Sequence, residues 1–286
     1  MRSPIKRYGG KGRIASFLVP HLVPTLNYAE PCFGAGSVFF QLPVGLYQRE
    51  AVNDLDSSIV TFFRVLRERP DELVRACEAT PYALDEFRTA LTVAADPLEE
   101  ARRVWIRSRQ SFSAADPLGA GCGRWSRPTG RSGWRPTVND NTLARLPEVA
   151  ARLRQVVIDH LDAADFIDRW GGGNTMVYVD PPYVHSTRNG LDYRHEMSDA
   201  DHARLAAACH GAAARGAHVA ISGYPCALYE QLYAGWRRIE IDTAATCARG
   251  LKGSRRTEVL WMSYAAALEL GHVPQLALGL EVGHAP

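Results

Sequence analysis

Apolar residues follow two patterns along the chain: short continuous runs and positions spaced at helical intervals. The runs are rich in β-branched and aromatic residues and end in polar or turn residues, so they predict strands. These strands are expected at 27–32, 50–54, 156–159, 176–180, 218–224, 237–242 and 258–264. Helical spacing predicts helices at about 57–67, 162–169, 199–215 and 225–234. Strands that alternate with helices indicate an α/β fold with a doubly wound sheet.

The stretch from residue 70 to 154 interrupts this alternation. Its pattern is helical apart from an irregular region at 113–137, which predicts an inserted, mainly helical subdomain. No helical pattern separates the last two predicted strands, so we expect an antiparallel hairpin at the sheet edge. The predicted organisation is therefore a core of residues 1–69 and 155–264, an insertion at 70–154, and a C-terminal tail at 265–286.

Composition is that of an ordinary globular protein. The 286 residues are 46% apolar and 22% charged, with a formal net charge of +2. The six cysteines form no C-x-x-C pair, which disfavours a zinc site and a disulfide framework. The N-terminal residues lack the apolar core of a signal peptide, and no apolar run is long enough to span a bilayer. We therefore expect a soluble, cytoplasmic protein that binds neither metal nor membrane. We also expect a monomer in solution.

The run "VYVDPPYV" (177–184) joins a buried strand to an acid, two prolines and a tyrosine. Neither proline has an N–H to donate, so the strand must end there, with Asp180 at its carboxyl end. Ligands of open α/β sheets bind at that edge. An ordinary strand exit would explain an isolated Asp-Pro, but the full run favours a site with four candidate catalytic residues: Asp180, Pro181, Pro182 and Tyr183.

A second cluster, "AEPCFGAGS" (29–37), contains two glycines that permit a tight turn after a strand. A helix is expected to begin near Ser37 and to offer its free N–H groups to a ligand. The dinucleotide-binding fingerprint is not met, because Phe39 occupies the place of its third glycine. Asp54 ends the next strand, where it could accept hydrogen bonds from ribose hydroxyls. The alternative for Asp54 is an acid that favours the dipole of the following helix.

A third cluster, "RYGGKGR" (7–13), offers an aromatic face, a flexible turn and a positive charge. In isolation it reads as a basic loop. The order "YGGK", "EPCFGAGS" and "DPPY", however, resembles the Dam-like (D12 class) adenine-specific DNA methyltransferases. The resemblance covers roughly 5–67 and 156–264, and extends to "RQSFS" (109–113) and "RRTEVLWMSY" (255–264).

This resemblance implies a Rossmann-like S-adenosylmethionine-dependent methyltransferase sheet with an inserted helical DNA-recognition subdomain. It implies methyl transfer from S-adenosylmethionine to N6 of adenine in double-stranded DNA, with the target base flipped out of the duplex. It also implies a cofactor pocket lined by Tyr8, Lys11, Glu30, Pro31, Phe33, Gly34, Gly36, Ser37, Asp54, Asp165 and Asp180.

The residues of the strand exit suit that reaction. Adenine N6 is a weak nucleophile, because its lone pair is delocalised into the ring. If the Asp180 carboxylate and the Pro181 carbonyl accept its two hydrogens, electron density returns to the nitrogen. Tyr183 is expected to stack on the flipped base and to offset part of the cost of unpairing it.

Basic residues gather in two places. Eight arginines and a single acid lie between residues 102 and 135, with tryptophans interleaved, and a second basic stretch spans 249–256. Arginine suits bidentate contact with guanine or phosphate, although a solvated surface loop is the plain alternative. We expect DNA contacts from Arg109, Arg124, Arg127, Arg131, Arg135, Lys252, Arg255 and Arg256.

Two other functions stay open at this stage. N4-cytosine methylation poses the same electronic problem, and a DNA-binding protein could keep the fold without catalysis. The Asp of DPPY favours adenine, and the intact motif favours an enzyme. The sequence leaves open which DNA site is recognised and whether the protein belongs to a restriction-modification system.

Overall fold

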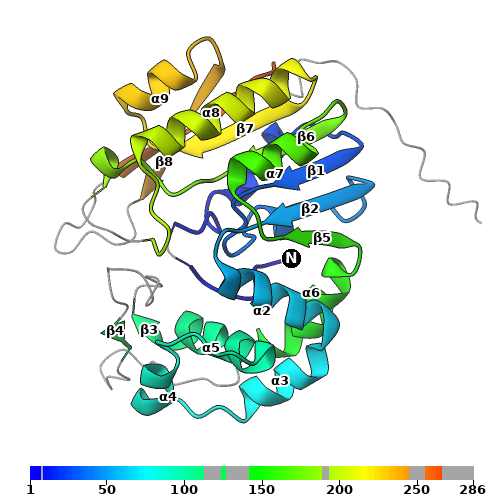
Figure 1. The fold of residues 1–286 in the computed structure, drawn as a ribbon, viewed down its shortest axis with the longest axis vertical. Coiled ribbons are helices and arrows are strands. Elements are labelled where there is room, and N and C mark those ends of the chain that lie inside the picture. The colour runs from blue at the N-terminus through cyan, green and yellow to red at the C-terminus, as the bar shows by residue number, and fades with distance from the viewer. Residues whose placement is uncertain (8, 113–123, 127–141, 189–192, 245–254, 266–286) are drawn as a thin grey trace, which may run out of the picture.

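A seven-stranded sheet organises the part of the chain that the computed structural model describes, residues 1–7, 9–112, 124–126, 142–188, 193–244 and 255–265 (Figure 1). The strand order is β5-β2-β1-β6-β7-β9-β8. The strands are β1 (Asn27–Glu30), β2 (Arg49–Asn53), β5 (Val156–Asp159), β6 (Thr175–Val179), β7 (His218–Gly223), β8 (Arg237–Ala244) and β9 (Arg255–Met262). All seven predicted strands are present, with bounds that differ from the prediction by three residues or fewer.

Strand direction and order create a switch point at the centre of the sheet. The five strands from β5 to β7 are parallel, whereas β9 is antiparallel to both β7 and β8. From β1 the chain adds β2 and β5 on one side, and later adds β6 and β7 on the other. The connections after β1 and β6 therefore diverge. A crevice at the carboxyl ends of these two strands is the place where doubly wound sheets bind ligands.

Side chains alternate between two apolar layers, as the period of a strand requires. In β6, Met176 and Tyr178 belong to one buried cluster, whereas Val177 and Val179 belong to the other. Every residue of β6 is buried, which explains why the sequence shows a continuous apolar run there. The sheet is thus covered on both faces.

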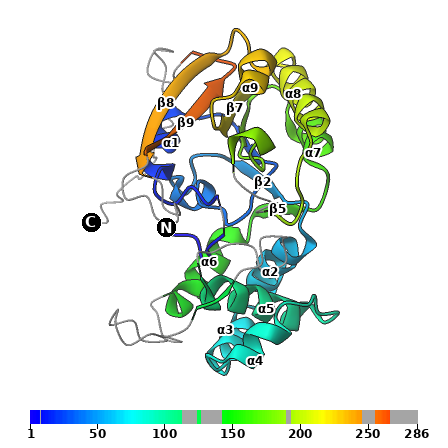
Figure 2. The ribbon, with the colours of Figure 1, turned by 90° about the vertical axis from the view of Figure 1, so that its left-hand side faces the viewer.

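Helices cover the two faces and extend beyond one edge of the sheet. Figures 1 and 2 show α7, α8 and α9 on one face, α1 on the other, and α3, α4 and α5 beyond β5. The helices are α1 (Ala15–Leu18), α2 (Ser57–Glu68), α3 (Pro70–Glu78), α4 (Leu84–Thr89), α5 (Pro97–Gln110), α6 (Leu146–Leu153), α7 (Ala163–Trp170), α8 (Asp199–Ala214) and α9 (Ala227–Leu232). Short 3-10 helices are η1 (Val19–His21), η2 (Phe39–Gln41), η3 (Leu143–Arg145) and η4 (His185–Thr187), and a two-stranded ribbon pairs β3 (Ser111–Phe112) with β4 (Arg124–Trp125).

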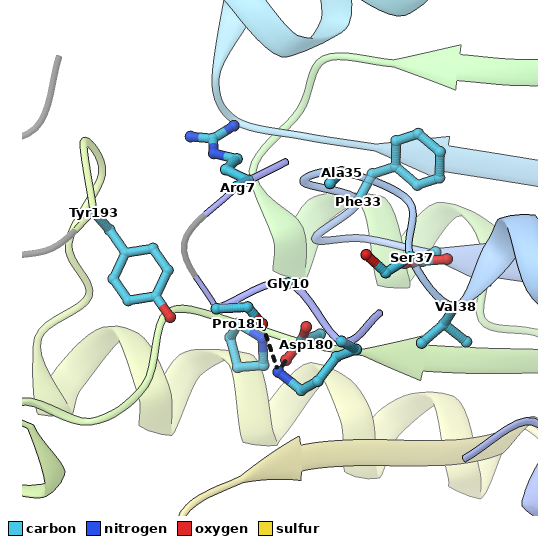
Figure 3. A pocket seen from close by; sticks show the side chains of 12 residues that line it. Arg7, Gly10, Phe33, Ala35, Ser37, Val38, Asp180, Pro181 and Tyr193 are labelled. Atoms are coloured by element: carbon cyan, nitrogen blue, oxygen red, sulfur yellow. Dashed lines mark hydrogen bonds and ion pairs between the residues drawn. The ribbon is translucent and has the colours of Figure 1, made fainter. Parts of the chain in front are cut away.

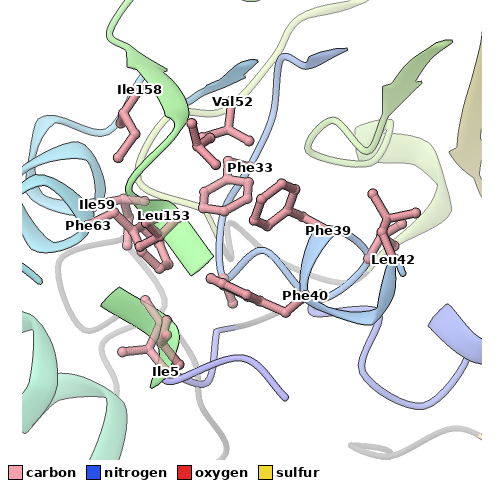
Figure 4. Packing of buried hydrophobic residues seen from close by; sticks show 14 of the residues in the cluster. Ile5, Phe33, Phe39, Phe40, Leu42, Val52, Ile59, Phe63, Leu153 and Ile158 are labelled. Carbon is pink, nitrogen blue, oxygen red and sulfur yellow. The ribbon is translucent and has the colours of Figure 1, made fainter. Parts of the chain in front are cut away.

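The helices between β2 and β5 share a core with the sheet. Val104 and Trp105 of α5 lie in the same buried cluster as Tyr28 of β1. Figure 4 shows other members of this cluster, among them Ile5 from the N-terminal residues and Phe33 from the loop after β1. Aromatic side chains fill much of this layer, with 4.8 Å between the ring centroids of Phe33 and Phe63. Burying one such ring contributes about 1.5–3 kcal/mol. The loop after β1 and the N-terminal residues are therefore anchored in the core.

Candidate active site

The turn after β1 brings the "EPCFGAGS" loop to the sheet edge. Gly34 and Gly36 have φ angles of 53° and 67°, a left-handed backbone that glycine adopts at little cost. A Cβ atom on Gly36 would lie 2.5 Å from Cζ of Phe33, so this glycine also makes room for a buried ring. The helix expected to begin near Ser37 is not there. The chain instead forms the three-residue η2, because its two left-handed glycines delay the helical backbone and Pro43 follows closely.

The end of β2 is tied to this turn by Asp54. Its Oδ2 accepts a hydrogen bond from the Gly34 N–H at 2.7 Å, and its Oδ1 accepts one from the Asp56 N–H at 2.8 Å. Burial raises the pKa of Asp54. The N-cap of α2 is Asp56 and not Asp54, since the Asp56 carboxylate accepts from the Ser58 N–H. The acid that favours the dipole of α2 is therefore Asp56, and not Asp54 as the alternative supposed.

Asp180 follows β6 and receives two donors on one oxygen. Lys11 Nζ lies 2.6 Å from Asp180 Oδ1 (Figure 3). The Ser222 hydroxyl, from β7, donates to the same oxygen at 2.9 Å. Among the described residues, the hydrogen bonds and the ion pair of this carboxylate are all made by Oδ1. Burial alone lowers the pKa of Lys11, but the carboxylates of Asp180 and Glu258 outweigh it, so the pKa lies above its usual value. Lys11 is thus a buried cation at neutral pH.

Tyr183, three residues after Asp180, is buried and only 4% exposed. Its hydroxyl donates to Glu258 Oε2 at 2.5 Å, and Lys11 Nζ sits over its ring, 4.5 Å from the centroid. Tyr224 meets the ring edge-on at 4.5 Å between centroids. The Tyr183 ring is the group expected to stack on a base. In this structure Lys11 covers one face of that ring.

Glu30, at the end of β1, is a second buried carboxyl group. It is 2% exposed and accepts a hydrogen bond from the Tyr28 hydroxyl at 2.7 Å. Burial raises the pKa of Glu30 well above its ordinary value, which favours the uncharged acid.

Two cavities meet at Asp180 and share Arg7 and Tyr193 as lining residues. The smaller, of about 380 Å³, is bounded by polar and charged groups together with apolar ones, including Lys11, Glu30, Phe33, Ser37 and Pro181. The larger, of about 970 Å³, is more apolar, with Pro31, Cys32, Asp54, Leu55, Asp162, Ala163, Ala164, Pro182, Met197 and Leu205 among its lining residues. A ligand that spans both cavities would therefore pass the Asp180 carboxylate.

Most of the predicted cofactor residues converge on these cavities. Lys11, Glu30, Pro31, Phe33, Ser37, Asp54 and Asp180 line one or both. Gly34 and Gly36 shape the turn without lining either space, and Tyr8 lies outside the described residues. The side chain of Asp165 is 70% exposed on the first turn of α7 and is not among the lining residues. Asp162, the N-cap of the same helix, lines the larger cavity instead.

The predicted DNA contacts are placed only in part. Arg109 does not extend away from the fold, since its guanidinium donates to the Pro4 carbonyl at 2.9 Å and lies over the ring of Trp105. Arg124 is in β4, and the backbones of Arg255 and Arg256 are in β9. Four other predicted contacts lie outside the described residues: Arg127, Arg131, Arg135 and Lys252.

Sequence reasoning missed a charged cluster that borders both cavities. Arg7 and Arg194 donate to opposite oxygens of Asp56 at 2.8 and 3.0 Å. Burial raises the pKa of Asp56, but these two guanidinium groups outweigh it and hold the pKa below its usual value. The three residues come from distant parts of the chain, and no spacing in the sequence indicates that they meet.

The described part of the chain offers neither a metal site nor a membrane anchor of the helical kind. It has no group of three or more His, Cys, Asp or Glu side chains placed to hold a metal ion. None of its helices combines the length and the apolar character needed to cross a bilayer.

Comparison with known proteins was made on sequence and on structure. The profile of the family described as "D12 class N6 adenine-specific DNA methyltransferase" matches residues 8–115 and 122–247. A DNA adenine methylase of Salmonella typhi is 25% identical over 244 residues, which are 81% of this chain and 84% of that protein. A DNA adenine methylase of Escherichia coli (strain K12) is 24% identical over 245 residues, with the same coverage.

Similarity to solved structures is weaker. A precorrin-8w decarboxylase of Methanobacterium thermoautotrophicum aligns with 88% of this chain and 89% of its own, with 8% identity and a TM-score of 0.38. This likeness is too low to bear on the site. The family profile spans the strand ends that carry Glu30, Asp54 and Asp180.

Proposed function

Because the chain belongs to the D12 class of N6 adenine-specific DNA methyltransferases, we propose that its two cavities hold S-adenosylmethionine as the methyl donor. The reaction of this family is methyl transfer to N6 of adenine in DNA. S-adenosylmethionine supplies an electrophilic methyl group on a sulfonium. The observation that carries the proposal is the position of Asp180, which lines both cavities at the switch point of the sheet.

The residues that line the two cavities suit the adenosine part and the methionine part of S-adenosylmethionine. Apolar side chains such as Leu55 and Ala164 line the larger cavity and suit a purine, while the carboxylate of Asp54 suits ribose hydroxyls. In the smaller cavity, the Lys11 cation suits the carboxylate of the methionine part, and a carboxyl oxygen of Glu30 can accept a hydrogen bond from its ammonium group. We therefore assign the adenosine part to the larger cavity and the methionine part to the smaller one.

Asp180 is the proposed catalytic acceptor. Lys11 and Ser222 both bind its Oδ1, so Oδ2 is the oxygen that we assign to the adenine amino group, with the Pro181 carbonyl as second acceptor. Two such hydrogen bonds localise the lone pair on N6 and orient it. Methyl transfer leaves N6 positively charged, and one of its protons then departs. The Asp180 carboxylate, already its acceptor, is placed to take that proton.

Pro182 and Tyr183 hold the acceptor in place. Pro182 stiffens the turn after Asp180 and lines the larger cavity. The Tyr183 ring is fixed by Glu258 through its hydroxyl, and we keep for it the role of stacking on a flipped adenine. Stacking on the face that Lys11 now covers would require Lys11 to move aside.

DNA recognition is assigned to the helical insertion. We propose that residues 1–69 and 155–264 form the catalytic core and that residues 70–154 contact double-stranded DNA, with Arg124 in the two-stranded ribbon among the contacts. We propose that the basic stretch at 249–256 binds phosphates of the DNA. The protein would act as a monomer, since one chain carries all the proposed catalytic groups.

A labelling experiment tests the proposed function. Purified protein is incubated with methyl-labelled S-adenosylmethionine and unmethylated duplex DNA, and the nucleosides are then separated. We expect the label in N6-methyladenine. Label only in N4-methylcytosine would overturn the adenine assignment, and absence of label despite a folded protein would overturn the proposed donor.

A further inference from the structure

The carboxyl end of α5 is bonded to the backbone of the N-terminal segment, residues 4–7 and 9–11. The Ser108 hydroxyl accepts a hydrogen bond from the Lys6 N–H at 2.7 Å. One residue further on, the guanidinium of Arg109 donates to the Pro4 carbonyl at 2.9 Å. These partners are more than a hundred positions apart in the sequence. Two adjacent helix residues thus hold two points of one short segment.

The surroundings make this contact well defined. The Arg109 guanidinium lies 4.4 Å from the ring centroid of Trp105, a buried residue of the same helix. Ser108 is also buried, and Ile5, between the two bonded points, lies in the main apolar cluster. A guanidinium stacked on a fixed ring loses little further freedom when it donates a hydrogen bond. The contact is therefore part of the packed fold.

The other end of the N-terminal segment reaches the proposed active site. Arg7 donates to Asp56 at 2.8 Å and lines both cavities. Lys11 donates to Asp180, and the Gly10 N–H bonds back to the Arg7 carbonyl at 3.2 Å. Only seven positions separate Pro4 from Lys11. A shift of the segment at Pro4 or Lys6 would therefore move the cation that holds Asp180.

We infer that Ser108 and Arg109 are positioning residues, which hold the N-terminal segment so that Arg7 and Lys11 keep their places in the cofactor cavities. This inference rests on the proposed function, because it takes the cavities to bind S-adenosylmethionine. It assigns Arg109 to cofactor binding and not to contact with DNA. Since α5 continues in sequence towards the arginines expected to contact DNA, the same helix links both activities.

The test measures cofactor binding in the absence of DNA. S-adenosylmethionine is titrated by calorimetry into the full-length wild type, Arg109→Ala, Ser108→Ala, Arg109→Lys and Arg103→Ala. We expect affinity to fall about tenfold in Arg109→Ala and Ser108→Ala, the effect of losing one such hydrogen bond. Arg109→Lys keeps a cationic donor and should recover most of the loss. Arg103, on the same helix, pairs with Glu99 and Thr92, so Arg103→Ala should bind like wild type.

The outcomes separate the alternatives. If Arg109→Ala binds the cofactor like wild type but loses DNA affinity, with the salt slope reduced by about one, then Arg109 is a phosphate contact and the inference is wrong. If Arg109→Ala does not fold, Ser108→Ala, which removes a single oxygen, still tests the inference through its affinity for S-adenosylmethionine. Wild-type cofactor affinity in Ser108→Ala and in every folded Arg109 variant would equally overturn the inference. Failure of the wild type to bind S-adenosylmethionine would instead refute the proposed donor.

Discussion

At the scale of single residues, the proposed reaction depends on which oxygen of the Asp180 carboxylate already accepts hydrogen bonds. Asp180 receives Lys11 and Ser222 on Oδ1, which fixes the carboxylate and turns Oδ2 towards a further donor. An amide at this position would keep the shape of the side chain. It would lose the negative charge, and one of its two acceptor positions would become a donor.

We therefore expect Asp180→Asn to lower the rate of methyl transfer by about 10² to 10³-fold, with the fold retained. Single-turnover labelling of DNA measures the rate, and the melting temperature checks the fold. Asp159 is a matched control, because it also ends a parallel strand but bonds to Trp170 outside the two cavities. Asp159→Asn should methylate DNA at the wild-type rate. A rate in Asp180→Asn close to that of the control would contradict the acceptor role.

Tyr183 gains a second role from the structure. Its hydroxyl bonds to Glu258, so Tyr183→Phe should lower the free energy of unfolding by about 1–3 kcal/mol and reduce methyl transfer moderately. Tyr183→Ala should lower both the free energy of unfolding and the rate of methyl transfer further, because it also removes the buried ring. Urea unfolding and the labelling assay measure the two effects. Equal rates in Tyr183→Phe and wild type would show that the hydroxyl does not matter for the reaction.

At the scale of elements, the turn between β1 and η2 decides the shape of the smaller cavity. Gly36 combines a φ of 67° with a Phe33 ring that leaves no room for a Cβ. The sequence predicts a turn here from its glycines. It cannot show that the glycine also accommodates a ring that packs against Phe63, because that contact depends on where α2 lies.

Gly36→Ala should destabilise the protein by about 1–3 kcal/mol and weaken binding of S-adenosylmethionine, because Phe33 must shift. Gly12→Ala is the control, since a Cβ there meets nothing within 4 Å. Chemical unfolding and calorimetry measure the two quantities. If both variants behave like wild type, the turn has more freedom than the contact with Phe33 implies.

At the scale of the whole molecule, we expect stability to depend on pH through a buried histidine that has no part in the proposed reaction. His202 of α8 has no exposed surface, and its Nδ1 lies 3.1 Å from the Tyr229 hydroxyl. Burial lowers the pKa of His202 from 6.5 to about 4. Below about pH 6.5 the unfolded chain binds the proton more readily, so stability is lost as the pH falls from 6.5 towards 4.

This one group should make the protein about 2 kcal/mol less stable at pH 5 than at pH 7. Urea unfolding measures the free energy of unfolding at both pH values. The difference between them should be smaller in His202→Gln than in the wild type. His210→Gln is the matched control, because His210 lies exposed on the same helix. An unchanged pH dependence in His202→Gln would mean that His202 contributes nothing to it.

What the sequence determined by itself is the local structure and the order of the motifs. The apolar run of β6 requires burial on both faces, and the prolines after Asp180 require the strand to end, because both effects depend only on neighbours in the chain. The D12-like order of motifs also pointed to the reaction that the family profile supports. The prediction of a helix beginning near Ser37, after the glycine turn, is wrong, because the left-handed backbone of Gly34 and Gly36 delays the helix and only the three-residue η2 forms.

Only the tertiary structure decided which side chains meet. Lys11 and Asp180 are 169 positions apart, and Tyr183 and Glu258 are 75 apart, yet each pair is in contact. The second pair meets because β6, β7 and β9 lie side by side in the sheet. Arg109 is basic and lies near other arginines, so its sequence neighbours suggested DNA, whereas its packed partners are Trp105 and the Pro4 carbonyl. Hydrophobic periodicity specifies the face on which a residue lies. The partner of a charged side chain depends on strand order and helix packing, which local pattern does not encode.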